Sequence, residues 1–446
     1  MRKERALVYG LAVAGEASAR ALLARHFHVT VADDRPTAEA VAVARELSVD
    51  LYEAPAPGKV ERLVERADVV VPSPGIPEGH PVIVSAQRLG VPLRSEIDLA
   101  AEWEAERSGG PRPMLAVTGT DGKTTTTLLA TAMLDHSGVS AVACGNTETP
   151  LVSALDADVE AFVVECTSFR LAWTASFRPA AAVWLNLAED HLDWHASMAT
   201  YGAAKSRIWL HQQPFDAAIG FIDDAVVMDH LATAPGRHVT FGLSGADYHV
   251  ADGWLVGPQG RLAAVESMRR RLPHDVTNAL AAAALVLEPG LATLDGVAAA
   301  LASFDGPHHR IELVAEGAGV AYYDDSKATT PHAAVTAIKS FEHVVLLAGG
   351  RNKGLDLAAL AAAPERLRAV VAIGEAAPEV EAAFAGICPV MAATSMDDAV
   401  GAARQFAGAG DVVLLSPGCA SFDWYTGYAE RGDDFARAVR SQLEGP

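Results

Sequence analysis

The residues most suited to chemistry lie in the run Thr118-Gly-Thr-Asp-Gly-Lys-Thr124, between an apolar stretch and a helical one. A glycine-containing turn of this kind leaves backbone N–H groups unpaired at the start of a helix, where they can bind a phosphate. Lys123 adds a positive charge, and Thr124 offers a hydroxyl to Mg²⁺. The full Walker pattern has glycine where this chain has Val117, so the motif is a shortened variant. A plain turn would not need lysine and threonine in tandem, and we therefore predict phosphate binding.

Polar residues also follow three β-rich stretches downstream of this loop. They are Asn146, Glu165, and Asn186 with the run Glu189-Asp-His-Leu-Asp193. Any one of them alone is typical of a cap or a turn. Because ligands bind at the carboxyl ends of parallel strands in open α/β sheets, we expect these residues to gather beside the phosphate loop. Glu165 and His191 would then supply ligands for Mg²⁺ near the phosphates.

The first part of the chain, residues 6–94, alternates β-rich runs at 6–11, 28–32 and 68–71 with helical stretches rich in Ala, Glu and Arg. This alternation predicts a parallel sheet with helices on both faces. The run Gly10-Leu-Ala-Val-Ala-Gly15 is a weak dinucleotide fingerprint, because alanine replaces its middle glycine. This domain could therefore bind a nucleotide-like ligand. An oxidoreductase that uses residues 6–34 to bind its cofactor is a second interpretation.

The rest of the sequence predicts an irregular β-containing insertion over residues 215–265 and an Ala-rich helix over 276–287 that carries Asn278 near its start. From residue 307 onward, strands again alternate with helices. These strands are expected at 320–323, 343–348, 369–373 and 412–415. We therefore predict an α/β protein of three domains. They are a Rossmann-like N-terminal domain over 1–94, a central P-loop ATPase domain with a parallel sheet over 95–306, and a Rossmann-like C-terminal domain over 307–446.

Composition narrows the classes of protein further. A chain of 446 residues is too long to fold around a single hydrophobic core, so we expect more than one domain. Its net charge of −21 argues against nucleic acid as a partner. The four cysteines lie far apart without metal-ligand spacing, and no apolar run is long enough to cross a bilayer. The first residues superficially resemble a signal peptide, but the short apolar run contains Gly10 and favours a first βα unit. We expect a cytoplasmic protein with no membrane or nucleic-acid partner.

Together these motifs resemble the Mur ligases, and the resemblance covers nearly the whole chain in its three-domain order. Beyond the phosphate loop and the strand-end residues, it rests on four further motifs: Ala203-Ala-Lys-Ser-Arg-Ile208, His309-Arg310, Asp325-Ser-Lys-Ala-Thr329 and Leu415-Ser-Pro-Gly-Cys-Ala-Ser421. Several motifs are most similar to the members that add D-glutamate to UDP-N-acetylmuramoyl-L-alanine (UDP-MurNAc-L-alanine). The resemblance thus implies an ATP-dependent amide bond between these substrates, made by a cytoplasmic monomer during peptidoglycan synthesis.

The resemblance also implies roles for individual residues. It implies catalytic roles for Lys123, Glu165, His191 and Lys205, and two Mg²⁺ ions held by Thr124, Glu165, His191 and a carbamylated Lys205. The ATP-binding residues it implies are Gly119, Thr120, Asp121, Gly122, Lys123, Thr124, Thr125, Asn278, Arg310, Asp325 and Lys327. The implied donor-binding residues are Asp34, Arg35, Ser73, Asn146, Thr167 and Arg170. The implied acceptor-binding residues are Thr329, Lys353, Ser421 and Tyr428.

The chain departs from the family pattern at several substrate positions. Asp121 stands where asparagine is usual, Arg170 where glutamine is usual, and Tyr428 where phenylalanine is usual. The loop after Gly145 reads Asn-Thr-Glu-Thr-Pro, and Thr330 replaces another asparagine. These departures leave the ligase class intact. They leave open another donor, another acceptor such as L-glutamate, and a paralogue that binds a nucleotide sugar without turnover.

Overall fold

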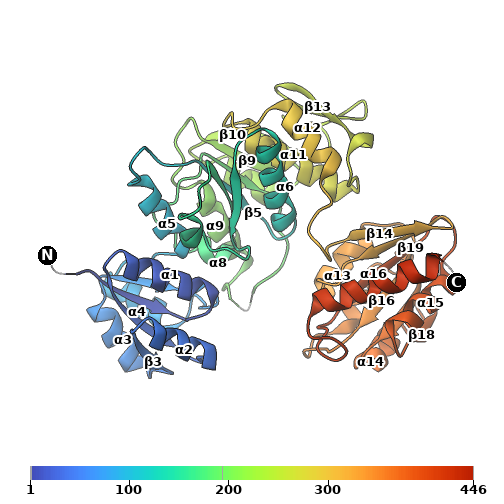
Figure 1. The fold of residues 1–446 in the computed structure, drawn as a ribbon, viewed down its shortest axis with the longest axis horizontal. Helices are drawn as coiled ribbons and strands as arrows, with labels where there is room; N and C mark the ends of the chain where they lie inside the picture. The colour runs from blue at the N-terminus through green and yellow to red at the C-terminus, as the bar shows by residue number, and fades with distance from the viewer. Residues whose placement is uncertain (1–2, 193, 445–446) are drawn as a thin grey trace. The chain divides into compact units, whose positions relative to one another are not determined.

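The computed structural model describes residues 3–192 and 194–444. Asp193, the last residue of the Glu189–Asp193 run, lies outside the described residues. The chain divides into two compact units, Met1–Phe304 and Asp305–Pro446. The first unit holds two parallel sheets and a small antiparallel one, and the second unit holds one large sheet (Figure 1). The expected α/β class with parallel sheets is confirmed.

The N-terminal sheet runs in the order β3-β2-β1-β4, and all its strands are parallel. Its elements are β1 (Arg5–Tyr9), α1 (Val13–Ala24), β2 (His28–Asp33), α2 (Ala38–Glu46), β3 (Asp50–Glu53), α3 (Pro57–Arg66), β4 (Val69–Pro72) and α4 (Pro81–Leu89). The three expected strands are confirmed. The sequence does not predict β3, because none of its residues is buried and it lacks an apolar run.

The central sheet runs in the order β10-β9-β8-β5-β7-β6 and is parallel throughout. Its strands are β5 (Met114–Thr118), β6 (Ala141–Gly145), β7 (Ala161–Glu165), β8 (Ala181–Trp184), β9 (Ala217–Phe221) and β10 (Arg237–Phe241). Every residue of β5, β7 and β8 is buried, as expected of strands covered by helices on both faces. These strands set the phosphate loop and Glu165 at one edge of the sheet.

The helices of this part of the chain begin with α5, which connects the two sheets. They are α5 (Glu96–Ala105), α6 (Lys123–His136), α7 (Leu151–Ala154), α8 (Ser168–Leu171), α9 (Met198–Ser206), α10 (Ala225–Leu231), α11 (Pro273–Leu287) and α12 (Leu294–Ser303). The Ala-rich helix predicted over 276–287 is confirmed as α11. From Ala279 to Leu287 every residue is buried, so α11 is apolar on all sides.

The expectation of an irregular insertion over residues 215–265 is only partly right. β9 and β10 lie in this segment, yet they extend the parallel central sheet, with β9 pairing with β8. Only β11 (His249–Ala251), β12 (Trp254–Gly257) and β13 (Gly260–Ala264) form a separate antiparallel sheet. The run Ala217–Phe221 is short and contains Gly220, which weakens its strand signal in the sequence.

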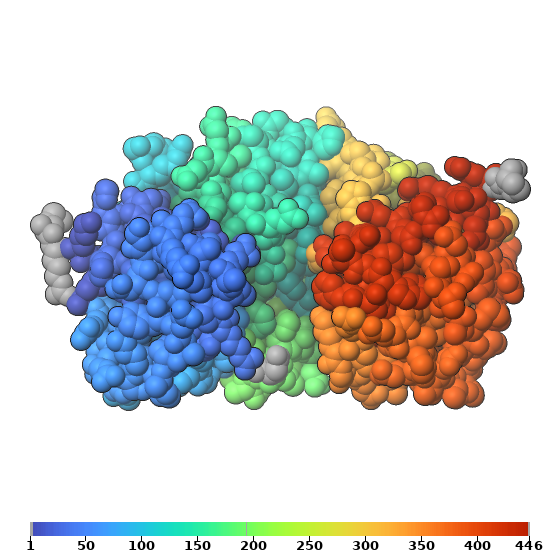
Figure 2. Space-filling view, turned by 60° about the horizontal axis from the view of Figure 1, so that its bottom comes forward, coloured from blue at the N-terminus to red at the C-terminus, as the bar shows by residue number. Residues whose placement is uncertain are grey.

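The N-terminal and central sheets share one hydrophobic core. Val8 and Val31 of the first sheet, Ile97 of α5, and Ala116 and Trp184 of the central sheet belong to the same buried cluster. Figure 2 shows the blue N-terminal residues packed against green residues of the central part. A common core of this kind fixes the orientation of the two sheets within the first unit.

The second unit contains one sheet in the order β14-β15-β19-β16-β17-β18, in which only β14 is antiparallel to its neighbour. Its elements are β14 (Glu312–Gly317), β15 (Val320–Asp324), α13 (Pro331–Lys339), β16 (Val344–Gly349), β17 (Leu367–Ile373), α14 (Ala377–Ala383), β18 (Val390–Ala392), α15 (Met396–Phe406), β19 (Val412–Gly418) and α16 (Tyr428–Glu444). The four expected strands are confirmed as β15, β16, β17 and β19. Among the described residues, no helix is long and apolar enough to cross a membrane.

Asp98 of α5 provides a test of what holds the two sheets together. Its buried carboxylate accepts hydrogen bonds from the backbone N–H groups of Ala175, Ser176 and Phe177 at 2.8 to 3.0 Å. We expect Asp98→Ala to lower the free energy of unfolding by about 3 kcal/mol, because buried N–H donors lose their acceptor. Glu106→Ala, an exposed residue directly after α5, should cost less than about 1 kcal/mol. Urea denaturation measures both, and equal losses would contradict the account.

Candidate active site

The phosphate loop joins β5 to α6 and is shaped by two glycines. Gly122 has a φ of +80°, and a Cβ atom there would lie 2.6 Å from the Asn278 side-chain oxygen. A Cβ at Gly119 would lie 2.9 Å from Cβ of Leu185. No side chain caps the first turn of α6, so its N-terminal N–H groups are directed at the loop. The loop therefore has the form of an anion site, and Asn278 of α11 lies beside it.

Asn186 holds the other side of the loop, a role that the sequence did not reveal. Its side-chain oxygen accepts hydrogen bonds from the N–H groups of Thr120 and Asp121, both at 2.9 Å. The Thr120 hydroxyl in turn contacts the Tyr201 hydroxyl at 3.2 Å. The sequence predicted unpaired N–H groups at the start of the helix, and the two N–H groups bonded to Asn186 lie in the turn before it. The N–H groups left for a phosphate are those at the start of α6.

Two lysines converge on one carbonyl group of the loop. Lys123 donates to the carbonyl oxygens of Gly119 at 2.9 Å and Thr120 at 2.7 Å. Lys205, on α9, donates to the same Gly119 oxygen at 2.6 Å. The two side-chain nitrogen atoms are therefore neighbours. This agrees with the resemblance, which implied that both lysines belong to one catalytic site.

Lys205 is unusual for a lysine on a helix because it is only 1% exposed. Burial lowers its pKa well below the ordinary value, and the nearby positive charge of Lys123 lowers that pKa further. Asp190 and Asp121 act in the opposite direction. Its ammonium also lies 4.6 Å from the centre of the Tyr201 ring. The neutral amine is therefore strongly favoured relative to an ordinary lysine.

Glu165 ends β7 with a buried carboxylate whose two oxygens differ. Oε1 accepts a hydrogen bond from the Asn146 side-chain amide at 2.9 Å, whereas Oε2 has no hydrogen-bond partner among the described residues. A buried carboxylate oxygen without a donor suits a hard cation such as Mg²⁺. The residues present therefore fit a metal at this position, with the hydroxyl of Thr124 at the start of α6 as a further candidate ligand.

His191 lies in a loop, with a φ of +55° and a partly exposed ring. Its Nε2 lies 3.3 Å from a carboxylate oxygen of Asp190, and its ring makes an edge contact with Phe169. Asp190 also influences the pKa of Lys205, which places the His191 loop in the electrostatic environment of the phosphate loop. The expected gathering of strand-end residues is therefore seen for this loop.

The predicted donor residues fall into two groups within the first unit. Asp34 accepts from the Tyr9 hydroxyl at 2.7 Å and lies 2.9 Å from a ring nitrogen of His80; Arg35 follows it in the chain. Ser73, which donates to the Gly10 carbonyl at 2.7 Å, lines a cleft together with Gly15, Phe169 and Arg170. This cleft joins residues of both sheets. Asn146 and Thr167 lie close to it, since Asn146 binds Arg170 and Thr167 caps the helix that carries it.

His195 and Glu78 also connect the two sheets, and the sequence reasoning gave neither of them a role. The fully buried His195 ring lies 3.0 Å from a Glu78 oxygen and 2.9 Å from the Ser168 hydroxyl. Burial lowers the His195 pKa, and the Glu78 carboxylate opposes this shift. Trp194 donates to the Pro74 carbonyl at 3.0 Å. Tryptophan and histidine directly after the Glu189–Asp193 run were the available signal, since such rings are seldom left in a solvated loop.

The second unit carries the remaining predicted ATP residues, Arg310, Asp325 and Lys327. Asp325 is buried, and burial raises its pKa to about 7 even though the Ser416 hydroxyl donates to it at 2.7 Å. Lys327 donates to the Tyr428 hydroxyl at 3.0 Å. Thr329 follows closely, and its N–H donates to the Lys327 carbonyl. The predicted ATP residues are thus divided between the two units.

The predicted acceptor residues lie on loops that are joined to one another. Arg351 and Ala420 exchange backbone hydrogen bonds at 2.8 and 3.1 Å, which ties the loop of Lys353 to that of Ser421. The Gly418 N–H donates to the Ala328 carbonyl at 2.9 Å, which adds the loop of Thr329. Lys353 is exposed, whereas Ser421 is buried. The structure therefore brings three predicted acceptor loops to one edge of the sheet.

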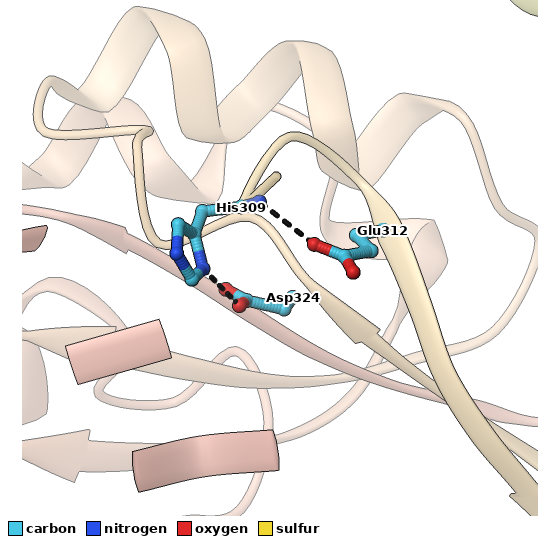
Figure 3. Close-up of side chains that lie close together, drawn as sticks. All are labelled: His309, Glu312 and Asp324. Atoms are coloured by element: carbon cyan, nitrogen blue, oxygen red, sulfur yellow. Dashed lines mark hydrogen bonds and ion pairs between the residues drawn. The ribbon is translucent and has the colours of Figure 1, made fainter. Parts of the chain in front are cut away.

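One group of histidine and carboxylate side chains in the described ranges has its ligand atoms close enough together to hold a metal ion. It consists of His309, Glu312 and Asp324. Figure 3 shows the three side chains, with dashed lines for the contacts of His309 with Glu312 and with Asp324. The His309 ring lies 2.7 Å from an Asp324 oxygen, and Glu312 accepts from the His309 backbone N–H at 2.9 Å. The Asp324 bond raises the pKa of His309 and so favours the protonated ring, which cannot bind a metal through that nitrogen. We therefore interpret this group as a structural cluster whose hydrogen bonds hold the chain at the start of β14 against β15.

Three known domain families match successive parts of the chain. A Mur ligase MurD-like N-terminal domain matches residues 4–95, and a Mur ligase middle domain matches residues 117–286. A Mur ligase glutamate ligase domain matches residues 309–419.

Curated relatives match along almost the full length. A protein of Frankia casuarinae named UDP-N-acetylmuramoylalanine–D-glutamate ligase is 46% identical, and the match covers 98% of this chain and 94% of that protein. A protein of the same name from Mycolicibacterium vanbaalenii is 39% identical, with 98% of each chain covered.

Solved structures share the fold at low identity. The MurF ligase of Thermotoga maritima, determined in complex with ADP, has a TM-score of 0.58 and 18% identity, covering 99% of this chain and 96% of that one. The UDP-N-acetylmuramate–alanine ligase MurC of the same organism has a TM-score of 0.56, 18% identity, and coverage of 99% and 100%. These likenesses establish the fold alone.

Asp325 makes the stability of the second unit depend on pH in a defined direction. Its pKa is raised to about 7 in the folded protein, compared with about 4 in an unfolded chain. A raised pKa stabilises the fold fully below the unfolded value, and this stabilisation is lost as pH rises through about 7. We expect Asp325→Asn, which stays neutral, to gain stability relative to the wild type as pH rises from about 4 to about 7. Hydrogen-exchange protection of β19 measures the difference, and a gap that does not change with pH would refute this assignment.

Proposed function

This chain belongs to the Mur ligase family, and from that membership we propose that it uses ATP to join D-glutamate to UDP-MurNAc-L-alanine. The observation that carries the proposal is the full-length similarity to relatives named for this reaction. Family membership bears out the resemblance seen in the sequence and sets aside the oxidoreductase alternative.

The first chemical step brings two anions together. The donor carboxylate must attack the γ-phosphate of ATP, which forms a bond from its oxygen to phosphorus and releases ADP. Lys123, held at the phosphate loop by the Gly119 and Thr120 carbonyls, is placed to offset the negative charge of the phosphates. Thr124, Thr125 and Gly122 surround the same anion site at the start of α6.

We propose that two Mg²⁺ ions serve this step, one held by Thr124 and Glu165, the other by His191 and Lys205. When bound, the ions supply positive charge to the phosphates and the donor carboxylate. The free Oε2 of Glu165 supports the first position. Magnesium commonly keeps several waters and substrate oxygens as ligands, so few protein ligands at each position are sufficient.

We propose that Lys205 acts as a carbamate. A buried ammonium beside Lys123 and a metal ion would be repelled by both, whereas the neutral amine reacts with carbon dioxide. The resulting carbamate is an anion with two oxygens, which suits a hard cation. Its burial at the phosphate loop supports this role over that of a solvated lysine.

The second step joins the amino acid to the acyl phosphate. The amine of glutamate attacks the acyl carbon, forms the C–N bond and expels phosphate. Lys353, Ser421, Thr329 and Tyr428 are proposed to hold the acceptor, and His191 is proposed to take the amine proton. Arg310, Asp325, Lys327 and Asn278 are proposed to bind ATP. Closure of the C-terminal domain, residues 307–446, over domains 1–94 and 95–306 would exclude water from the acyl phosphate.

The donor is assigned to the cleft between the two sheets of the first unit. Ser73 and Arg170 line this cleft, and Asn146 and Thr167 lie close to it through Arg170. Asp34 and Arg35, beside Tyr9 and His80, are proposed to extend the donor site along the N-terminal sheet. We also propose that the protein acts in the cytoplasm, where its proposed nucleotide substrates would be found. We propose separately that it acts as a monomer, as the family resemblance implies.

The direct test is ATP-dependent phosphate release with UDP-MurNAc-L-alanine and a panel of amino acids that includes both enantiomers of glutamate. We expect D-glutamate to be preferred and the amide product to appear by mass spectrometry. Lys123→Ala serves as the inactive control, because loss of this cation should cost about two to three decades in rate. A preference for L-glutamate, or ADP formation without product, would contradict the proposal.

The carbamate proposal makes a prediction about two variants of Lys205. We expect Lys205→Ala to lose nearly all activity and to regain part of it in acetate, which fills the vacated site with a carboxylate. Lys205→Arg should be inactive, because it keeps a positive charge but cannot be carbamylated. Phosphate release measures all three conditions, and an active Lys205→Arg enzyme would rule out the carbamate.

The acceptor assignment predicts a selective change in affinity. Lys353→Met should raise the KM for glutamate by about tenfold or more and leave the KM for ATP nearly unchanged, because only the acceptor loses a cationic partner. Lys339→Met removes an exposed lysine from α13 of the same unit and should change neither value. Steady-state kinetics with each substrate varied in turn provide the test. Equal changes in both KM values would show that Lys353 does not select for the acceptor.

A further inference from the structure

Four polar side chains form a continuous series from α5 to the end of β7. In order, they are Glu96, Arg170, Asn146 and Glu165. Glu96 is 3% exposed and Arg170 is 7% exposed, so a carboxyl group and a guanidinium are buried together at the base of the cleft. Burial raises the pKa of Glu96, and the nearby Arg170 opposes that shift. The series ends at the carboxylate proposed to hold Mg²⁺.

The hydrogen bonds of this series have a fixed direction. Arg170 donates from Nη1 to the Asn146 side-chain oxygen at 2.7 Å, and the Asn146 amide nitrogen donates to Glu165 Oε1 at 2.9 Å. A guanidinium can only donate, and an ionised carboxylate can only accept. One orientation of the Asn146 amide therefore satisfies both neighbours, although the side chain itself is exposed and would otherwise be able to turn over.

Glu96 keeps Arg170 in this position. One Glu96 oxygen accepts from the Val152 N–H at 2.8 Å, and the other lies 3.5 Å from Arg170 Nε. Neither of these last two atoms has a hydrogen-bond partner among the described residues, so their contact is an ion pair alone. A buried guanidinium needs an opposite charge nearby, and Glu96 provides it. Because Glu96 is the first residue of α5, the helix that connects the two sheets anchors the series.

The residue type at position 170 matters for this arrangement. A glutamine amide at this position could either donate or accept. Such a side chain would be compatible with both orientations of Asn146. Arginine removes that freedom, and it requires a buried countercharge that glutamine does not need.

We propose that Glu96 and Arg170 are a positioning pair that locks the Asn146 amide, so that Glu165 keeps one oxygen hydrogen-bonded and presents the other to the metal. The inference rests on the proposed function only in assigning a divalent cation to Glu165. Loss of the pair lets Asn146 turn over and Glu165 change its orientation, which weakens the metal site without removing any of its ligands.

The test measures binding of Mn²⁺, as a probe for Mg²⁺, to the full-length protein in the presence of a non-hydrolysable ATP analogue, by electron paramagnetic resonance. Arg170→Met alone leaves Glu96 buried without a countercharge and can unfold the protein. The informative variant is therefore E96Q/R170M, in which the amide oxygen introduced on α5 still accepts from the Val152 N–H while both charges are removed. Its melting temperature confirms that it is folded.

We expect E96Q/R170M to bind Mn²⁺ about tenfold more weakly than the wild type, the typical effect of losing a partner of a metal ligand. E96Q/R170Q should recover part of this loss, because a glutamine can donate to Asn146 in one of its orientations. The matched control is Arg178→Met, which breaks an arginine–carboxylate pair with Asp216 on the same unit and should leave Mn²⁺ affinity unchanged.

Wild-type Mn²⁺ affinity in folded E96Q/R170M would overturn the proposal, as would an equal loss in Arg178→Met. Failure of the wild type to bind Mn²⁺ would overturn it too, because Glu165 would then hold no cation. The assay uses neither donor nor amino acid. A wild type that binds Mn²⁺ but forms no amide would count against the proposed ligase reaction and leave the positioning pair supported by its own measurement.

Discussion

Two lysine side chains that share one carbonyl oxygen set the main constraint on this molecule. Lys123 and Lys205 both donate to the Gly119 oxygen, and Lys205 is almost completely buried. Two ammonium groups in such a place repel each other strongly, because few water molecules screen them. The arrangement is favourable only if anions arrive or one lysine loses its charge. An ATP-dependent reaction at a phosphate loop meets the first condition, and a carbamate on Lys205 meets the second.

The surrounding fold holds the two lysines and the polar residues around them in place. Parallel strands β5, β7 and β8 end at the same edge and deliver the phosphate loop, Glu165 and Asn186 to it. The shared core and α5 hold the cleft lined by Ser73 and Arg170 beside that edge. Asp98 of α5 accepts hydrogen bonds from the three successive N–H groups of residues 175–177. The buried pair Glu96–Arg170 extends the same anchoring through Asn146 to Glu165.

The sequence alone predicted the parts of the site that depend on local patterns. The phosphate loop, Glu165 at a strand end and the helix that begins near Asn278 are all set by short-range spacing. The sequence could not predict that Asn186 bonds the loop or that Glu96 pairs with Arg170, since these contacts join residues far apart in the chain. It also missed β3, because strand pairing there relies on backbone hydrogen bonds rather than on an apolar pattern.

The charge state of Lys205 is the claim on which the account most depends, and carbon NMR can observe it directly. The full-length protein is equilibrated with isotopically labelled bicarbonate, with and without Mg²⁺ and ATP. The account predicts one carbamate resonance that disappears in Lys205→Ala and persists in Lys123→Ala. A spectrum without any carbamate signal, or one whose signal remains in Lys205→Ala, would contradict it.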